Sequence, residues 1–143
     1  MLLYLDNCCF NRPYDDQSHS RIYLETQAKL YVQEQILSGH HSLVWSYILQ
    51  FENDQNPHTA HKHEIAKWKK LSTHLIGASE NIINNANLYQ TFGLRVKDAL
   101  HCACAVEANA DFFLTTDKQL INKARAISGL KVINPLVFID EDI

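Results

Sequence analysis

The chain has 143 residues, of which 46% are hydrophobic, and its formal net charge is -3. This is enough apolar material for one core and too little chain for two ordinary domains, so we expect a single domain over 1–143. The negative charge excludes a protein that coats nucleic acid by bulk positive charge. No segment resembles a membrane span or a signal peptide, which predicts a cytoplasmic protein.

The predicted elements alternate between strands and helices. In chain order, we expect strands at 2–5, 42–45, 112–116 and 131–133, an edge piece at 136–139, and helices at 18–38, 46–53, 58–72, 79–92, 96–109 and 118–127. Short apolar runs predict the strands, and Gly39, Gly93 and Gly129 are stop signals that bound helices or lead into strands. This alternation predicts an α/β fold with a central parallel sheet between helical layers, a three-layer α/β/α domain.

Acidic residues follow the predicted strands at their carboxyl ends. Asp6 ends the first strand, Asp117 follows strand 112–116, and Glu52 lies on the helix after the second strand. Ligands of such sheets bind beyond the carboxyl ends of the strands, so these acids are expected near one another. Asp98 opens helix 96–109, where a carboxylate is favoured by the helix dipole, and joins the cluster if that end of the helix faces the same cleft.

Converging carboxylates repel one another unless a cation neutralises them, and hard oxygen ligands suit Mg²⁺ or Mn²⁺. Without the charges of these four acids, the net charge of -3 becomes +1, which is compatible with a nucleic-acid substrate. Carboxylates that hold one or two divalent ions commonly cleave phosphodiesters, because the metal activates water and offsets charge on the phosphate. The predicted chemistry is hydrolysis of nucleic acid.

The stretch "GLRVKDALHCACAVEANADFFLTTDKQL", 93–120, closely resembles the diagnostic segment of PIN-domain proteins. In that family an aspartate opens a helix with an Ala-Leu-His follow-on. A strand of the pattern small-Asp-aromatic-aromatic-Leu-Thr-x-Asp comes next. The aspartate in "LLYLDNCCF" and the glutamate in "SYILQFE" match the other two family acids in order and setting, so the resemblance covers essentially the whole chain.

The resemblance implies a function and a set of site residues. The metal-binding acids of the family fall on Asp6, Glu52, Asp98 and Asp117, its strand-end hydroxyl residue on Thr115, and a small polar orienting residue on Asn7. It implies a Mg²⁺- or Mn²⁺-dependent ribonuclease that acts on RNA. The small stand-alone chain resembles VapC-type toxins, so we also expect an antitoxin partner protein and a homodimer.

Several residues keep two interpretations. Asp98 and Asp117 could act only as helix caps, and Glu52 could be a solvated surface residue, but the motifs favour metal binding. Arg12 could reach a substrate phosphate or pair with Asp15 or Asp16. His101, one turn after Asp98, could orient groups in the cleft or be a structural partner.

The cysteines form two tight pairs, 8–9 and 102–104, and we expect reduced thiols. Because a soft thiolate beside hard oxygen ligands would favour zinc, Cys8 and Cys9 are expected to point away from the metal.

Other interpretations remain open for the polar middle segment and for the whole chain. His58, His61 and His63 could bind a transition metal or nothing specific, and the lysines around Trp68 could hold RNA or form a solvated face with one anchoring ring. A dehalogenase-type phosphatase would need an acid where Cys8 stands. The remaining alternatives are a PIN nuclease in RNA processing that is not a toxin, and a degenerate PIN-like binding module.

Overall fold

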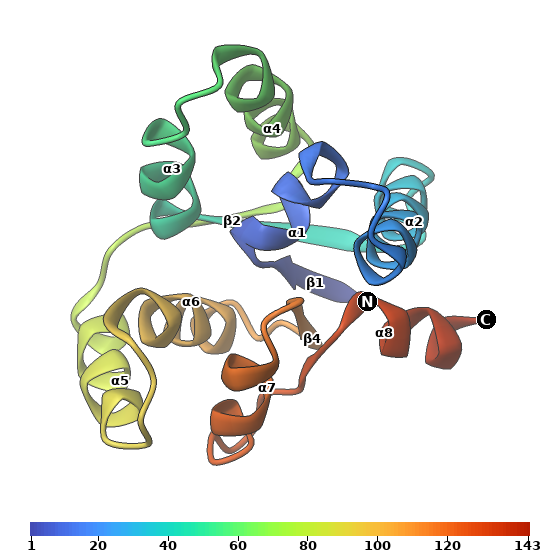
Figure 1. Cartoon of the computed structure of the whole chain (residues 1–143). Coiled ribbons are helices and arrows are strands. Elements are labelled where there is room, and N and C mark those ends of the chain that lie inside the picture. Colours follow the sequence, from blue (N-terminus) through green and yellow to red (C-terminus); the bar gives the residue numbers. More distant parts are fainter.

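The computed structural model describes residues 1–143 and contains one sheet with helices on both sides of it (Figure 1). The strands are β1 Leu2–Leu5, β2 Ser42–Ser46, β3 His74–Ile76, β4 Phe112–Leu114 and β5 Val132–Ile133. The helices are α1 Asn7–Asn11, α2 Ser20–Leu37, α3 Tyr47–Asp54, α4 Thr59–Leu71, α5 Glu80–Gln90, α6 Val96–Glu107, α7 Lys118–Ala124 and α8 Pro135–Asp142, with a 3₁₀ turn at Arg12–Tyr14. All strand pairs are parallel, so the predicted α/β/α architecture is confirmed.

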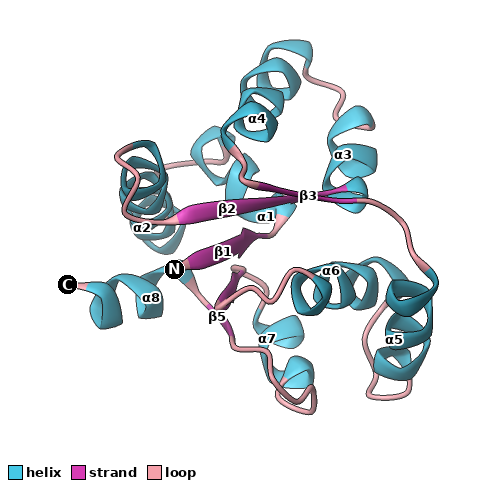
Figure 2. Ribbon diagram, turned by 180° about the vertical axis from the view of Figure 1, so that it is seen from behind, coloured by secondary structure: helices cyan, strands magenta, loops and turns pink.

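The strand order is β3-β2-β1-β4-β5, which puts β1 in the middle of the sheet. From β1 the chain adds β2 and then β3 on one side, and it returns through α5 and α6 to add β4 and β5 on the other side (Figure 2). The direction of winding therefore reverses next to β1. In open parallel sheets, the crevice at such a switch point is where ligands bind.

The central strands are apolar because helices cover both of their faces. Leu3, Leu5, Phe113 and Leu114 are completely buried and belong to one continuous core cluster. Small residues on α6 let this helix lie close to its neighbours, since Ala99 and other alanines of the helix are inaccessible to solvent. The close packing of α6 fixes the position of its N-terminal turn, which matters for the site.

The expected edge piece at 136–139 was wrong, because these residues belong to helix α8. Pro135 occupies the first turn, where its missing N–H costs nothing, and the side chain of Asn134 accepts a hydrogen bond from the backbone N–H of Leu136. Phe138 is buried against the core. These start signals outweigh the strand propensity of the apolar residues in this segment.

Two further elements were not expected from the sequence. The edge strand β3 has only three residues, and its two apolar residues make too short a run to predict a strand. Helix α1 follows Asp6 directly, where the sequence indicated only a turn near Pro13.

All four cysteines are free thiols, as expected. None of the helices is long and apolar enough to cross a membrane.

Candidate metal centre

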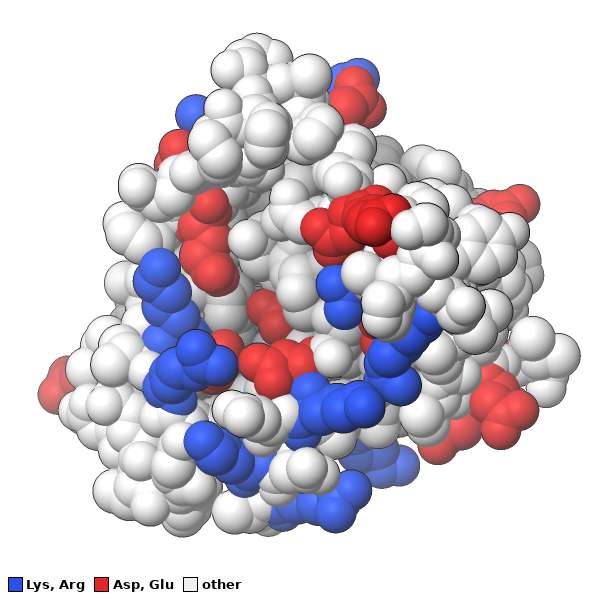
Figure 3. Space-filling model, viewed as in Figure 1, with Lys and Arg blue, Asp and Glu red and all other residues white.

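A hollow of about 400 Å³ opens at the carboxyl ends of the central strands. It is lined by Glu52, Arg95, Val96, Lys97, Asp98 and Asp117. Figure 3 shows acidic side chains in this central part of the surface and basic side chains in an arc around its left, lower and right sides. The structure thus brings three of the predicted site acids to one hollow, although they are far apart in the sequence.

Asp6 lies beside this hollow and is held by hydrogen bonds on both carboxylate oxygens. Its Oδ1 accepts from the backbone N–H of Asn7 at 2.8 Å, which caps α1, and its Oδ2 accepts from Thr115 Oγ1 at 2.7 Å. The residue is only 8% exposed. Each carboxylate oxygen has a second lone pair, so Asp6 keeps acceptor capacity for a cation.

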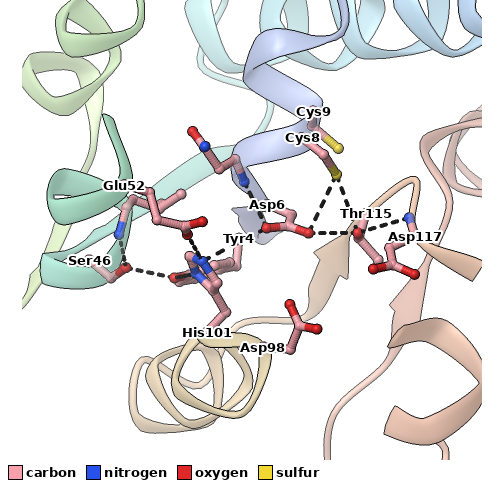
Figure 4. A network of polar contacts seen from close by, with 12 residues as sticks. Tyr4, Asp6, Cys8, Cys9, Ser46, Glu52, Asp98, His101, Thr115 and Asp117 are labelled. Atoms are coloured by element: carbon pink, nitrogen blue, oxygen red, sulfur yellow. Dashed lines mark hydrogen bonds and ion pairs between the residues drawn. The ribbon is translucent and has the colours of Figure 1, made fainter. Parts of the chain in front are cut away.

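Glu52 is connected to the core by a relay of polar side chains (Figure 4). His101 Nε2 hydrogen-bonds to Glu52 Oε1, and His101 Nδ1 lies 2.6 Å from the hydroxyl oxygen of Tyr4. The same hydroxyl lies 2.6 Å from Ser46 Oγ, which also accepts from the backbone N–H of Leu49 and so caps α3. The relay joins β1, the end of β2, α3 and α6, and it is buried except at Glu52.

The protonation of this relay follows from its partners. Burial raises the pKa of Tyr4 well above its usual range, so the hydroxyl stays protonated. Ser46 Oγ accepts from Leu49 and has its own proton free for Tyr4, whose proton then goes to His101 Nδ1. With a proton on Nε2, His101 donates to Glu52, and every atom of the relay then has a partner. His101 therefore orients the Glu52 carboxylate.

Asp98 is in the first turn of α6 and is held more loosely. Its only polar contact with a side chain is with Arg95, whose Nε lies 3.8 Å from Asp98 Oδ2 and which is largely exposed. Burial raises the pKa of Asp98, and the negative charges of Asp6 and Asp117 raise it further. Asp98 therefore feels the charge of the neighbouring acids, although it does not belong to the group of ligand atoms within 4.8 Å of one another that Asp6, Glu52 and His101 form.

Asp117 has the structural role that the sequence left open, and it also faces the hollow. Its Oδ1 accepts from the backbone N–H groups of Gln119 and Leu120 and caps α7. Its Oδ2 lies 4.0 Å from Arg95. The two oxygens therefore differ in their surroundings, and helix capping occupies only one of them.

Thr115 connects the acids of the two neighbouring strands. Its hydroxyl donates to Asp6 and accepts from the backbone N–H of Asp117 at 3.2 Å. Cys9 points into the core as expected, but Cys8 does not point away from the site, because its Sγ lies 3.4 Å from Asp6 Oδ2. The first turn of α1 begins at Asn7, so the thiol folds back against β4, where Thr116 Oγ1 donates to it.

Arg12 and Asn7 have less direct positions. The guanidinium of Arg12 is paired with Asp15 at 3.0 Å and with the fully buried Glu25 at 3.0 Å, so the structural pairing left open by the sequence is present. Arg12 does not line the hollow. Asn7 contributes its backbone N–H to Asp6, while its side-chain Oδ1 is buried and has no hydrogen-bond partner.

The donor set fits a hard divalent cation. Asp6, Glu52 and His101 each offer a ligand atom, and these atoms lie within 4.8 Å of one another. Asp98 and Asp117 add negative charge next to this group, since the charges of Asp6 and Asp117 both raise the pKa of Asp98. The carboxylate oxygens suit Mg²⁺ or Mn²⁺, whereas the imidazole nitrogen suits a transition metal, and the unpaired charge of the cluster is a reason for a cation to bind. His101 can ligate through Nε2 only if its proton moves to Nδ1 and is donated to Tyr4.

Comparison with known proteins agrees with this fold. No protein-family model matches the chain, and no curated protein sequence does. A chain of the crystal structure of VapBC2 from Rickettsia felis bound to a DNA fragment from their promoter superimposes with a TM-score of 0.57 and 16% sequence identity. The match covers 94% of this chain and 98% of that chain. The chain therefore has the fold expected from the PIN-domain resemblance, with similarity over nearly its whole length.

The sequence did not reveal the relay behind Glu52. The sequence predicts an orienting role for His101 as one of two interpretations, but it assigns Tyr4 only to strand 2–5 and Ser46 only to the start of helix 46–53. The one available signal is that both interrupt apolar strands with hydroxyl groups, in "LLYL" and "SLVWS". Their meeting with His101 depends on how α6 packs against β1 and β2, which no local pattern specifies.

Proposed function

We propose that the chain is a metal-dependent endoribonuclease that hydrolyses RNA phosphodiester bonds. The observation that carries this proposal is the convergence of Asp6, Glu52, Asp98 and Asp117 at the switch point of the sheet, where the pKa of Asp98 is raised by burial and by neighbouring acids. Such a cluster is destabilising unless something offsets it, which supports a role in binding a cation.

In this proposal the four acids hold one or two Mg²⁺ or Mn²⁺ ions, and the metal supplies an activated water and charge neutralisation at the phosphate. Thr115 and the backbone N–H of Asn7 fix the orientation of Asp6. His101 fixes the orientation of Glu52. These contacts hold the carboxylates in place before substrate arrives, which reduces the reorganisation needed during the reaction.

Groups on the substrate side are basic or polar. Lys97 and Arg95 line the hollow and offer positive charge to a phosphate backbone. Asn7 is proposed to help orient the site. Arg12 is the weaker candidate for a phosphate contact, because its guanidinium is engaged by Glu25 and Asp15 and would have to leave one of them.

We further propose that the chain is the toxin of a type II toxin-antitoxin pair, acts in the cytoplasm as a homodimer, and has a cognate antitoxin protein as its partner. The support is the similarity in fold to a chain from a VapBC2 complex. Two alternatives share the fold: a PIN nuclease in RNA processing, and a PIN-like binding module without catalysis. A neighbouring short reading frame for a DNA-binding protein would favour the toxin, and its absence would favour RNA processing.

The nuclease proposal is tested by incubating the purified chain with RNA in the presence of Mg²⁺, Mn²⁺ or a chelator. We expect cleavage with either metal and none with the chelator. Asp98→Asn should abolish cleavage while the chain stays folded, as monitored by circular dichroism. If Asp98→Asn leaves RNA cleavage unchanged, the acid cluster is not the active site. If the parent chain binds RNA but never cleaves it, the binding module is the better description.

A further inference from the structure

An exposed aromatic ring lies beside the acid hollow and has no structural task in the core. Phe51 precedes Glu52 on α3, and its side chain is 50% exposed. The buried side of the helix is formed by Ile48, Leu49 and Asn53, so helical periodicity turns position 51 outward. Single exposed apolar side chains are common on protein surfaces, so exposure alone assigns Phe51 no role, and its position next to Glu52 is what makes it a candidate for substrate contact.

The ring is held in a defined place by a cation from the opposite wall. Lys97 Nζ lies 5.6 Å from the centroid of the Phe51 ring. Lys97 precedes Asp98 on α6 and lines the hollow together with Glu52 and Arg95. The contact therefore bridges α3 and α6 at the point where each carries a site acid. A cation–π contact of this kind restrains the ring without burying it.

An unpaired nucleobase fits this pair of residues. A base presents a flat π-face that stacks on an aromatic ring, while the phosphates next to it are attracted by Lys97 and Arg95. A base inside a duplex already stacks on its neighbours and has no free face, so the platform distinguishes single strands from duplexes. The phosphate adjacent to the stacked base would then lie toward the acids.

We propose that Phe51, in contact with Lys97, is a stacking platform for an unpaired base next to the phosphate in the acid hollow. This inference rests on the proposed ribonuclease function and adds a residue that positions its substrate. The stacked base need not have a particular identity, because every base has a π-face.

The test measures the affinity for a short, unstructured, fluorescently labelled RNA by anisotropy, with the same strand annealed to its complement as the second probe. All proteins carry Asp117→Asn to prevent cleavage, since asparagine still caps α7. Phe51→Ala and Phe51→Leu should weaken single-strand binding by about 5- to 150-fold, as expected for one lost base–aromatic stack. Phe51→Trp should retain it. Duplex affinity should not change in any of these variants.

Two controls separate stacking from other roles. Tyr23→Ala removes an aromatic side chain of similar exposure, 49%, from α2 and should leave the affinity unchanged. An oligonucleotide with an abasic nucleotide at the stacked position should reproduce the loss, and its effect should not add to that of Phe51→Ala. Losses that do add, or that are equal for single strands and duplexes, would overturn the stacking proposal.

The failure of this inference can be told from the failure of the proposed function. If the parent chain cleaves RNA with metal but Phe51→Ala binds single strands as tightly as the parent, the platform is refuted and the nuclease stands. If Phe51→Ala instead converts a dimer to a monomer in light scattering without changing RNA affinity, the ring belongs to a protein interface. If no variant and no parent binds RNA, both proposals fall.

Discussion

The inner and outer halves of the acid cluster are held in different ways. The inner half, defined here as Asp6, Glu52 and His101, is fixed by hydrogen bonds to buried groups of the sheet and of α6. The outer half, defined as Asp98 and Asp117, meets solvent at the hollow, and its only cationic side-chain contact is the exposed Arg95 at 3.8 and 4.0 Å. The inner half is built into the core, whereas in the outer half Asp117 is fixed through one oxygen by capping α7 and Asp98 has only the distant, exposed Arg95.

This difference teaches how a cluster of acids can be tolerated in a small domain. Carboxylates of the inner half are stabilised by donors that the fold supplies, so folding already offsets part of their desolvation. For Asp98 no such donor exists, and the raised pKa records the cost. A bound cation should therefore offset the cost of the acids mainly in the outer half. The inner half should determine where the cation binds.

The largest expected effect comes from breaking the inner half at Asp6. Asp6→Asn should reduce Mn²⁺ affinity by at least about 100-fold, the upper end of the loss seen when partners of ligands are removed. The stabilisation of the chain by millimolar Mn²⁺ in thermal unfolding should disappear with it. Asp111→Asn is the matched control, because Asp111 lies at the other end of β4 and accepts from the backbone N–H of Leu2. Unchanged Mn²⁺ stabilisation in Asp6→Asn would place the cation elsewhere.

The relay behind Glu52 is probed by Tyr4→Phe. Removing the hydroxyl takes away the buried partner of His101 Nδ1 and one of the two partners of Ser46 Oγ, so the free energy of unfolding should fall by about 1–3 kcal/mol. Mn²⁺ affinity should fall by about 10-fold, because His101 no longer fixes Glu52. Tyr89→Phe removes a hydroxyl from another buried tyrosine, for which no hydrogen-bond partner is found, and should do neither. A loss of stability with intact Mn²⁺ affinity would mean that the relay is only structural.

The pH dependence of stability tests the outer half without metal. Because the pKa of Asp98 is raised in the folded chain, the folded state binds more protons than the unfolded state between the two pKa values. The contribution of Asp98 to the free energy of unfolding therefore falls as the pH rises from the pKa of the unfolded chain through the raised pKa of the folded chain. In a chelator at neutral pH, Asp98→Asn should be more stable than the parent by less than about 1 kcal/mol, and this difference should vanish in acid. Urea unfolding at several pH values measures it, and a less stable variant at neutral pH would contradict the assignment.

The smallest effect is expected for Arg95→Ala. Its ion pairs are long and exposed, so the free energy of unfolding should change by less than about 1 kcal/mol, and high salt should remove even this difference. Chemical denaturation at low and high ionic strength provides the measurement. A large loss that persists in salt would show that Arg95 is a structural part of the outer half.

The sheet, and the placement of Asp6, Glu52 and Asp117 at one edge of it, were predictable from sequence because they depend on local patterns, whereas the place of Asp98 depends on how α6 is oriented. An apolar run that ends in a carboxylate, as at Asp6, fixes both a strand and the edge to which its acid belongs. The exposed strand at His74–Ile76 has an apolar run of only two residues, which is too short to reveal it, and residues 136–139 look like a strand until the cap at Asn134 is considered.

The contacts between elements were not accessible in this way. Two contacts arise where α3 packs near α6: Glu52 contacts His101, and Phe51 contacts Lys97. The two helices lie far apart in the sequence, so no local pattern predicts these contacts. Likewise, the return of Cys8 onto Asp6 depends on helix α1, whose first turn follows the strand without a loop. Sequence position predicted which acids share an edge, but packing decides what orients them.

The central claim is that the two halves form one metal-dependent centre for RNA cleavage. It is tested most directly by the rate of RNA cleavage as a function of Mn²⁺ concentration, measured side by side for the parent chain, Asp6→Asn and Asp111→Asn. We expect the rate to rise and saturate with Mn²⁺ for the parent and for Asp111→Asn, and to stay at least about 100-fold lower for Asp6→Asn. Cleavage by the parent in a chelator, or by Asp6→Asn at the parental rate, would contradict the account.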